Sequence, residues 1–507
     1  MSDKNNKSKI TPEEANLQKI ISHAKEYGFV FPSSEIYDGL QAVYDYAQNG
    51  VELKNNLKNV WWKAMTMLHE NIVGIDAAIF MHPTTWKASG HIDSFNDPMV
   101  DNKDSKKRYR ADVLIENRAE EIRKEGKENN QKESQEIAQT LVQKMADFLT
   151  AENMEGLKNL LIEEKITCPV SKTSNWTDVR QFNLMFSTQM GAVAEESETI
   201  YLRPETAQGI FVNFLNVQKT GRGTSMKIPF GIAQIGKAFR NEIVARQFIF
   251  RMREFEQMEM QYFVRPNDQK EHFDYWKAKR HKFLLAIGIP AEKLRFHDHE
   301  KLAHYADTAT DIEFEFPFGF KELEGIHSRT DYDLKQHQIH SKKKLQFFDE
   351  ELKENYVPFV VETSIGADRL FLATMCNAYT EDIGKDANGE EKIRPYLKLH
   401  PALAPIKVAV FPLVKKDGLP EKAREVFELL RYDFNAIYEE RGAIGKNYTR
   451  QDMLGTPFCV TIDHQTLEDG MVTIRHRDTT AQERVNISDV NGKISQAVSI
   501  KRILEKL

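Results

Sequence analysis

The amino-acid sequence predicts an α+β protein, in which a core built on an antiparallel sheet with helices is followed by a small α/β domain. Three observations lead to this prediction. Helical periodicity runs through much of the chain before residue 90, strand-like runs with helical insertions occupy residues 168–375, and strands alternate with a helix after residue 403. A chain of 507 residues has room for several domains.

Residues 1–100 form the first predicted region and contain a long helix. Lys and Asn lie opposite its apolar side, which is formed by Val51, Leu53, Leu57, Val60 and Trp61. The apolar run 77–81 then predicts a strand that ends before Pro83.

Three further regions follow. Residues 101–167 are dense in Glu, Lys, Arg, Asn and Gln, which predicts a solvated helical insertion. Residues 168–400 complete the core, and Pro401 and Pro405 bracket the linker to a domain at 403–507. In that domain we expect a helix at 421–440 and strands at 406–412, 458–462 and 471–474, a pattern typical of a small α/β domain.

Bulk composition argues against several classes of protein. The polar start lacks a signal-peptide run and no stretch has the apolar length of a membrane span, so we expect a cytoplasmic protein without a membrane partner. Cys168, Cys376 and Cys459 form no CxxC pair, which argues against a zinc ribbon or a disulfide framework. A formal net charge of −6 argues against nucleic-acid binding through bulk charge but leaves room for a local basic patch.

Two motif-like stretches fail on inspection. Residues 231–238 nearly match a P-loop, but Ala238 stands where a Mg²⁺-binding hydroxyl is required, and the segment is predicted to be a strand. His299 and His304 are one residue too far apart for the HExxH pattern, so on a helix they would not share a face. We therefore expect no zinc and no protein-bound metal.

The most informative stretch is a predicted pair of strands at 238–243 and 252–262. Side chains alternate between the faces of a strand, so Met258, Met260 and Tyr262 are expected to face the core. The other face is polar and carries both charges. An antiparallel hairpin would place these side chains on one wall: Arg240, Glu242, Arg253, Phe255, Gln257 and Glu259.

This wall has two interpretations. Arginine forks match phosphate oxygens and a phenyl ring offers a stacking face, so the wall fits an anionic, aromatic ligand, and its carboxylates could bind an ammonium or amino group. The alternative is an ordinary half-exposed sheet with salt bridges across it.

A second stretch, residues 360–375, predicts a buried strand that ends at Glu362 and a helix that starts near Gly366. Arg369 then lies in the first helical turn, where a positive side chain is unfavourable unless an anion lies nearby. This makes Arg369 a candidate phosphate ligand. The alternative is that it pairs with Asp368 or Glu362.

These stretches resemble the sequence motifs of class II aminoacyl-tRNA synthetases. Residues 239–242 with 253–255 resemble motif 2, Gly366–Arg369 resembles motif 3, and the helix and strand before Pro83 resemble motif 1. Residues 202–211, 253–259, 362–366 and 449–458 are similar to the glycyl-tRNA synthetase family in particular.

The resemblance implies that ATP activates glycine as glycyl-adenylate, with Mg²⁺ on the phosphates, before transfer to tRNA(Gly) by a homodimer. Arg240 and Arg369 would be the catalytic residues, holding the α- and γ-phosphates. The full ATP site would comprise Arg240, Asn241, Glu242, Phe250, Arg251, Met252, Arg253, Glu254, Phe255, Glu322, Leu323, Gly366, Ala367, Asp368 and Arg369. The glycine site would comprise Arg110, Glu205, Phe255, Glu256, Gln257, Met258, Glu259, Glu362, Thr363, Ser364, Ile365 and Gly366.

The domain at 403–507 resembles the anticodon-binding domain of class IIa synthetases. Its candidates for phosphate contacts and base stacking are Arg441, Lys446, Tyr448, Arg450, Arg475 and Arg477.

Two alternatives remain open. A related class IIa synthetase, for threonine, proline or serine, is disfavoured by the carboxylate-rich pocket. A non-catalytic RNA-binding or accessory descendant is disfavoured by the presence of Arg240, Arg253 and Arg369.

Overall fold

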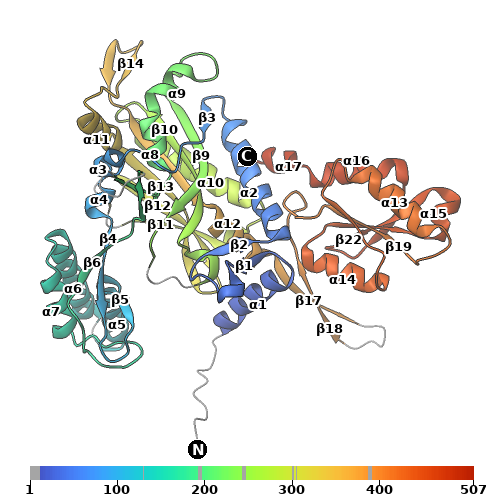
Figure 1. Ribbon diagram of the computed structural model, residues 1–507, viewed down its shortest axis with the longest axis horizontal. Coiled ribbons are helices and arrows are strands. Elements are labelled where there is room, and N and C mark those ends of the chain that lie inside the picture. Colours follow the sequence, from blue (N-terminus) through green and yellow to red (C-terminus); the bar gives the residue numbers. More distant parts are fainter. Residues whose placement is uncertain are drawn as a thin grey trace, which may run out of the picture. The chain divides into compact units, whose positions relative to one another are not determined.

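The computed structural model describes residues 12–129, 131–191, 197–242, 247–299, 302–303, 305–385 and 391–507 (Figure 1). It divides into two compact units. The first takes the described parts of Met1–Ile79, Glu205–Ala238 and Gln247–Leu507, and the second takes those of Phe80–Pro204 and Phe239–Arg246.

The first unit is built on a seven-stranded sheet with the strand order β11-β12-β13-β16-β10-β9-β3. The pairs from β11 to β10 are antiparallel, whereas β3 and β9 run parallel. The strands are β3 (Ile72–Ile75), β9 (Phe230–Phe239), β10 (Glu254–Val264), β11 (Leu294–Asp298), β12 (Thr308–Phe316), β13 (Gly319–Thr330) and β16 (Phe359–Gly366).

The two faces of β10 differ as its alternation predicts. Met258, Met260 and Tyr262 are buried in the main hydrophobic core, which also receives helix α10 (Gln269–Ala286) packed against β13 and β16. The opposite face of β10 carries Gln257, Glu259 and Gln261. This face is polar only along that stretch, because farther along the sheet it carries a second apolar cluster that includes Phe230, Phe263 and Val360.

Three predicted boundaries in this unit are wrong. No separate strand begins at residue 238, because β9 covers the P-loop-like segment and ends at Phe239. Ile243, the predicted end of that strand, lies outside the described residues. The strand at 360–362 continues to Gly366, because residues 363–366 pair with β10 and residues 363–365 also pair with β13. The strand expected at 77–81 lies instead at 72–75, where it pairs with β9.

Helix α2 (Gln48–Thr66) matches the predicted N-terminal helix. Leu53, Leu57, Val60 and Trp61 are buried as expected, but Val51 is exposed because it lies on the first turn, outside the apolar stripe. Helix α12 (Ala367–Ala378) packs against α2. The remaining elements of this part are α1 (Pro12–Glu26), β1 (Val30–Pro32), β2 (Tyr44–Tyr46), α8 (Ala207–Val212), α9 (Phe214–Thr220), α11 (Tyr332–Ser341), β14 (Phe347–Asp349), β15 (Glu354–Tyr356), β17 (Tyr379–Lys385) and β18 (Glu391–Leu397).

The C-terminal part of the first unit has a second, five-stranded sheet with the order β20-β19-β21-β22-β23. The predicted helix at 421–440 is wrong at its end: α13 stops at Leu430 because the chain then forms β20, which pairs in parallel with β19. The elements are β19 (Val408–Pro412), α13 (Leu419–Leu430), β20 (Ala436–Tyr438), α14 (Ile444–Leu454), β21 (Phe458–Ile462), α15 (His464–Asp469), β22 (Met471–His476), β23 (Gln482–Asn486), α16 (Ile487–Val498) and α17 (Lys501–Leu504).

The second unit combines a three-stranded sheet, β5-β4-β6, with a bundle of three helices and a separate hairpin, β7-β8. The helices share a core with the sheet through Leu114, Leu141, Leu157 and Trp176. The elements are α3 (Pro83–Ala88), α4 (His91–Ser94), β4 (Asn96–Asp101), β5 (Arg108–Arg110), α5 (Ala111–Asn129), α6 (Gln131–Thr150), α7 (Met154–Glu163), β6 (Arg180–Asn183), β7 (Ser187–Met190) and β8 (Glu198–Tyr201).

No helix within the described part of the chain has both the length and the apolar character needed to cross a membrane.

Candidate active site

Two buried glutamates approach each other on the polar face of the central sheet. Glu259 on β10 and Glu362 on β16 are 2% and 4% exposed. The side chain of Gln261 joins them, since its Nε2 donates to Glu259 Oε1 at 3.2 Å and to Glu362 Oε2 at 2.6 Å. The Thr206 hydroxyl also donates to Glu259. The structure therefore brings together two of the carboxylates predicted to bind an ammonium group.

The surroundings of Glu259 and Glu362 shift the pKa values of their carboxyl groups in opposite directions. Burial raises the pKa of Glu259 well above its ordinary value, and the carboxylates of Glu362 and Glu205 raise it further. Burial would raise the pKa of Glu362 as well, but Arg329 and His327 outweigh it and lower that pKa below its ordinary range. The site without ligand favours a protonated Glu259 beside an ionised Glu362.

Arg329 is the buried cation of this network. Its Nη1 donates to Glu362 Oε2 at 3.0 Å, while Nε and Nη2 donate to the two carboxylate oxygens of Asp333 at 2.8 and 3.0 Å. Gln208 continues the network, donating to Asp333 Oδ1 at 3.0 Å and to Glu205 Oε1 at 2.8 Å. Glu205, the third predicted ammonium ligand, is thereby linked to the other two.

A second group of predicted residues gathers around Arg369. This residue lies in the first turn of α12, as predicted, and its Nη1 lies 3.0 Å from Glu322 Oε2. Its guanidinium also lies 4.5 Å from the centre of the Phe250 ring. Arg369 thus pairs with an acidic residue, as the alternative interpretation held, but this residue is Glu322 and not one of the two examples, Asp368 and Glu362.

Asp368 and Glu256 have a different setting, because their carboxylates are buried and bonded to protein groups. Lys54 Nζ lies 2.6 Å from Asp368 Oδ1 and 3.1 Å from Glu256 Oε2. The Tyr46 hydroxyl donates to Asp368 Oδ1 at 2.5 Å, and Lys58 reaches Glu256 Oε1 at 2.8 Å. These contacts fix the start of α12 against β10 and α2.

Several other predicted glycine-site residues turn their side chains to the core. Met258 and Ile365 belong to the main hydrophobic core, and Thr363 is fully buried opposite Met260. Ser364 lies on the polar face, directly across from Glu259. Ser364 and Glu259 therefore carry polar side chains on the same face of the sheet.

The second unit holds Arg240, Asn241, Glu242 and Arg110. Arg240 Nε donates to Pro204 O at 3.0 Å, and its guanidinium lies 5.5 Å from the centre of the Phe95 ring. Burial would lower the pKa of Arg110, but Asp112, Asp97 and Glu242 together raise it. Arg110 and Glu242 are therefore neighbours within this unit.

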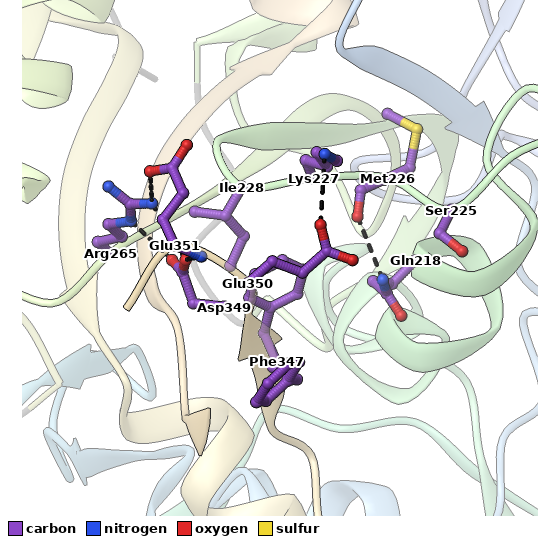
Figure 2. A pocket seen from close by; sticks show the side chains of 11 residues that line it. Gln218, Ser225, Met226, Lys227, Ile228, Arg265, Phe347, Asp349, Glu350 and Glu351 are labelled. Carbon is purple, nitrogen blue, oxygen red and sulfur yellow. Dashed lines mark hydrogen bonds and ion pairs between the residues drawn. The ribbon is translucent and has the colours of Figure 1, made fainter. Parts of the chain in front are cut away.

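A surface pocket lies near the β14–β15 hairpin. Figure 2 shows that its charged side chains pair with one another, Arg265 with Asp349 and Glu351 at 2.7 and 2.5 Å, and Lys227 with Glu350 at 3.6 Å. Ligand binding here would have to break these pairs. The pocket is better explained as a surface salt-bridge network.

Comparison with known proteins agrees with the geometry. Family models match three segments: the glycyl-tRNA synthetase insertion domain 1 at residues 97–184, the class II tRNA synthetase core domain (G, H, P, S and T) at 186–378, and an anticodon binding domain at 407–497. The glycine–tRNA ligase of Chlorobaculum tepidum is 54% identical over 93% of this chain and 98% of its own length. The chain belongs to the glycine–tRNA ligase family.

Other members of the glycine–tRNA ligase family are similar over nearly the same length. The relative from Staphylococcus saprophyticus is 49% identical over 95% of this chain and 99% of its own, and that from Geobacillus thermodenitrificans is 48% identical over 96% and 98%. The predicted family is confirmed. So is the predicted α+β class, with a class II core and a C-terminal anticodon binding domain.

In this glycine–tRNA ligase family member, two predicted RNA-contacting arginines are instead structural. Arg475 is buried and makes a two-pronged contact with Asp452 at 2.8 and 2.9 Å. Arg477 is 2% exposed and donates to the carbonyl oxygens of Gly455 and Leu399. Arg441, Lys446 and Arg450 are exposed and remain candidates.

Sequence reasoning missed Arg329, His327, Asp333 and Gln208 in the site of this family member. The run Arg329–Asp333 contains the signal, a cation near the end of β13 and a carboxylate four residues later in the first turn of α11. That spacing alone is common on surface helices. Only the register of β13 against β16 shows that the pair faces Glu362.

Proposed function

We propose that this chain attaches glycine to tRNA(Gly) in two steps. A carboxylate oxygen of glycine attacks the α-phosphate of ATP, so that glycyl-adenylate forms and pyrophosphate leaves. A ribose hydroxyl at the tRNA 3′ end then attacks the glycyl carbonyl carbon and AMP leaves. Both steps depend chiefly on positioning and on stabilising charge.

The unequal pair Glu259 and Glu362 is the observation that carries this proposal. Arg329 and His327 already compensate Glu362, whereas Glu259 is held protonated by burial and by neighbouring carboxylates. An ammonium group placed beside Glu259, Glu205 and Glu362 would stabilise the ionised form of Glu259 and release its proton. Glycine has no side chain and therefore suits a site formed by the closely paired strands β10 and β16.

We assign the phosphate side of the reaction to the two predicted arginines. Arg240 would hold the α-phosphate and Arg369 the γ-phosphate, for which Arg369 would exchange its contact with Glu322. Phe255 would stack on adenine. Glu322 offers a carboxylate to the Mg²⁺ that accompanies ATP as substrate.

The finer assignments follow the same lines. The remaining ATP-site and glycine-site residues named from the sequence would contribute backbone or positioning contacts, as Asp368 does through Lys54. We propose domain boundaries at 1–100, 101–167, 168–400 and 403–507, and a cytoplasmic location. We also propose a homodimer that uses the motif 1-like helix and strand before Pro83; a sedimentation mass of one chain would contradict it.

Charging of a tRNA(Gly) transcript by the full chain tests the proposed function. Glu259→Gln should lower kcat/KM for glycine by about 30-fold or more, because truncating one partner of a buried charge pair costs at least about 2 kcal/mol. The KM for ATP should change little. Glu425→Gln, in an exposed pair with Lys422 on α13, is the control.

The contradicting result is a correctly folded Glu259→Gln protein with unchanged kcat/KM for glycine. That outcome would remove Glu259 from ammonium recognition. No charging by the parent protein would remove the activity itself.

A further inference from the structure

Two rows of side chains cross the polar face of the sheet toward its β11 edge. In the first row, His299 bonds to Ala309 through the backbone at 3.1 Å, Ala309 pairs with His327, His327 with Glu362, and Glu362 with Gln261. Residues directly opposite in antiparallel strands share a face. The two histidines therefore flank the small side chain of Ala309.

The second row lies next to the first. Asp311 pairs with Gly325, Gly325 with Ser364, and Ser364 with Glu259. Asp311 is thus about two strand spacings, roughly 10 Å, from Ser364 of the proposed glycine site. The rows place Asp311 beside His299 and His327 on one face.

The potential metal-binding atoms of these three side chains converge. One ligand atom from each of His299, Asp311 and His327 lies within 4.8 Å of the other two. His299 Nε2 is 2.9 Å from Asp311 Oδ2. A tetrahedral ion with bonds of about 2.0–2.1 Å would draw such atoms to roughly 3.3 Å from one another, a small adjustment for side chains.

The histidine on β13 is already oriented for a ligand. His327 Nδ1 lies 2.8 Å from Glu362 Oε1, which leaves Nε2 directed away from Glu362. Imidazoles that bind metals are commonly held through the other nitrogen by a carboxylate. Glu362 is itself fixed by Arg329, so this support is rigid.

The space between the ligand atoms is kept open by Gly325. A Cβ atom at this position would lie 2.7 Å from His327 Cε1, 3.4 Å from His327 Nε2 and 3.6 Å from Asp311 Oδ1. Any other residue would put its side chain between two of the three groups. Gly325 and Ala309 therefore put no large side chain among the three groups.

We propose that His299, Asp311 and His327 bind one divalent transition-metal ion, with Zn²⁺ the best match. Two imidazoles and one carboxylate suit Zn²⁺ and related ions, and water would complete the coordination. No metal was predicted from the sequence, because the spacing of His299 and His304 was judged as if both lay on one helix. The three ligands come instead from the end of β11 and from two further strands. His304 lies outside the described residues. The ion would lie beside the proposed glycine site, because His327 also bonds to Glu362, but the metal proposal does not rest on the proposed function.

Co²⁺ titration of the full, tag-free chain tests this site, because tetrahedral Co²⁺ gives an intense visible absorption band. We expect the band to saturate at one equivalent and to be displaced by Zn²⁺. His299→Gln and Asp311→Asn should each weaken Co²⁺ binding by about tenfold or more. Neither side chain contacts Glu362 in the way that His327 does, so both variants leave the proposed glycine site intact.

His464→Gln is the matched control, since His464 forms a similar pair with Asp417 at 3.0 Å elsewhere in the chain. It should bind Co²⁺ as the parent does. Zn²⁺ should also raise the unfolding temperature of the parent and of His464→Gln but not of His299→Gln. Absence of the band, or equal binding by His299→Gln and His464→Gln, would overturn the proposal.

Discussion

Arg329 is a single buried residue that holds two carboxylates in place. Its side chain is 6% exposed and reaches Glu362 and Asp333, which are similarly buried. Burial would lower the pKa of Arg329, but Asp333, Glu362 and Glu205 raise it well above its ordinary value. The cation therefore determines the charge of the carboxylate pair beside the proposed glycine site.

Replacing Arg329 by Met should destabilise the fold by about 3–5 kcal/mol, because two buried carboxylates lose their partner. Urea unfolding gives the free energy. Arg431→Met is the control, since its pair with Glu428 is about half exposed and should be worth less than about 1 kcal/mol. Equal effects of the two changes would contradict the role of Arg329.

His23 is buried beside aromatic rings and should make stability depend on pH. Its ring stacks on Tyr27 with centroids 4.7 Å apart, and burial lowers the pKa of His23 to about 4. An unfolded histidine has a pKa of about 6.5, so the unfolded state binds the extra proton between these values. The stabilisation is complete above about pH 6.5 and is lost as the pH falls toward 4.

His23→Phe should remove this dependence. The difference in unfolding free energy between the variant and the parent should shift by up to about 3 kcal/mol in favour of the variant between pH 7.5 and pH 4. Denaturant unfolding at several pH values measures it. Parallel pH curves would show that folded His23 takes up its proton at the same pH as the unfolded chain, and would contradict the lowered pKa.

Single residues were predictable where chemistry is local. The first-turn position of Arg369 and the alternation of Met258 and Met260 follow from spacing along one element. Arg329 and His327 were not predictable, because their partners lie on another strand and depend on register. The burial of Arg475 and Arg477 depends in the same way on distant groups, Asp452 and Leu399.

A cluster of charged side chains fixes helix α12 to its neighbouring elements. Lys54 on α2 contacts Asp368 at the start of α12 and Glu256 on β10. Burial would lower the pKa of Lys54, but these two carboxylates raise it. The lysine thus joins three elements next to Arg369.

Lys54→Met should destabilise the protein by about 3–5 kcal/mol and raise the KM for ATP, because α12 also positions Arg369. Unfolding and steady-state kinetics report the two effects. Lys19→Met, which breaks an exposed pair with Glu381, should do neither. A stable Lys54 variant with normal ATP kinetics would contradict this clamp.

Elements with strong periodicity were predicted well and their ends less well. The amphipathic pattern placed α2, and the apolar run 458–462 coincides with β21. The end of α13 and the extension of β16 were missed, because sheet pairing with β19, β10 and β13 overrides local preference there.

At the scale of the whole molecule, the C-terminal domain is tied to the core within the first unit. Arg394 on β18 reaches Asp452 on α14 at 2.8 Å, and Arg477 on the loop after β22 donates to Leu399 O at 2.7 Å. The segment that matches an anticodon binding domain is thereby in contact with the part proposed to hold glycine. We propose that this chain activates glycine, and no larger amino acid, with ATP.

Amino-acid-dependent exchange of pyrophosphate into ATP, measured across all twenty amino acids without tRNA, tests this claim most directly. We predict exchange with glycine alone and a loss of at least about 100-fold in Arg240→Ala, since one charge-stabilising group commonly contributes that much. Exchange with another amino acid would contradict the glycine pocket. No exchange with any amino acid would contradict the proposed catalysis and favour a non-catalytic accessory protein.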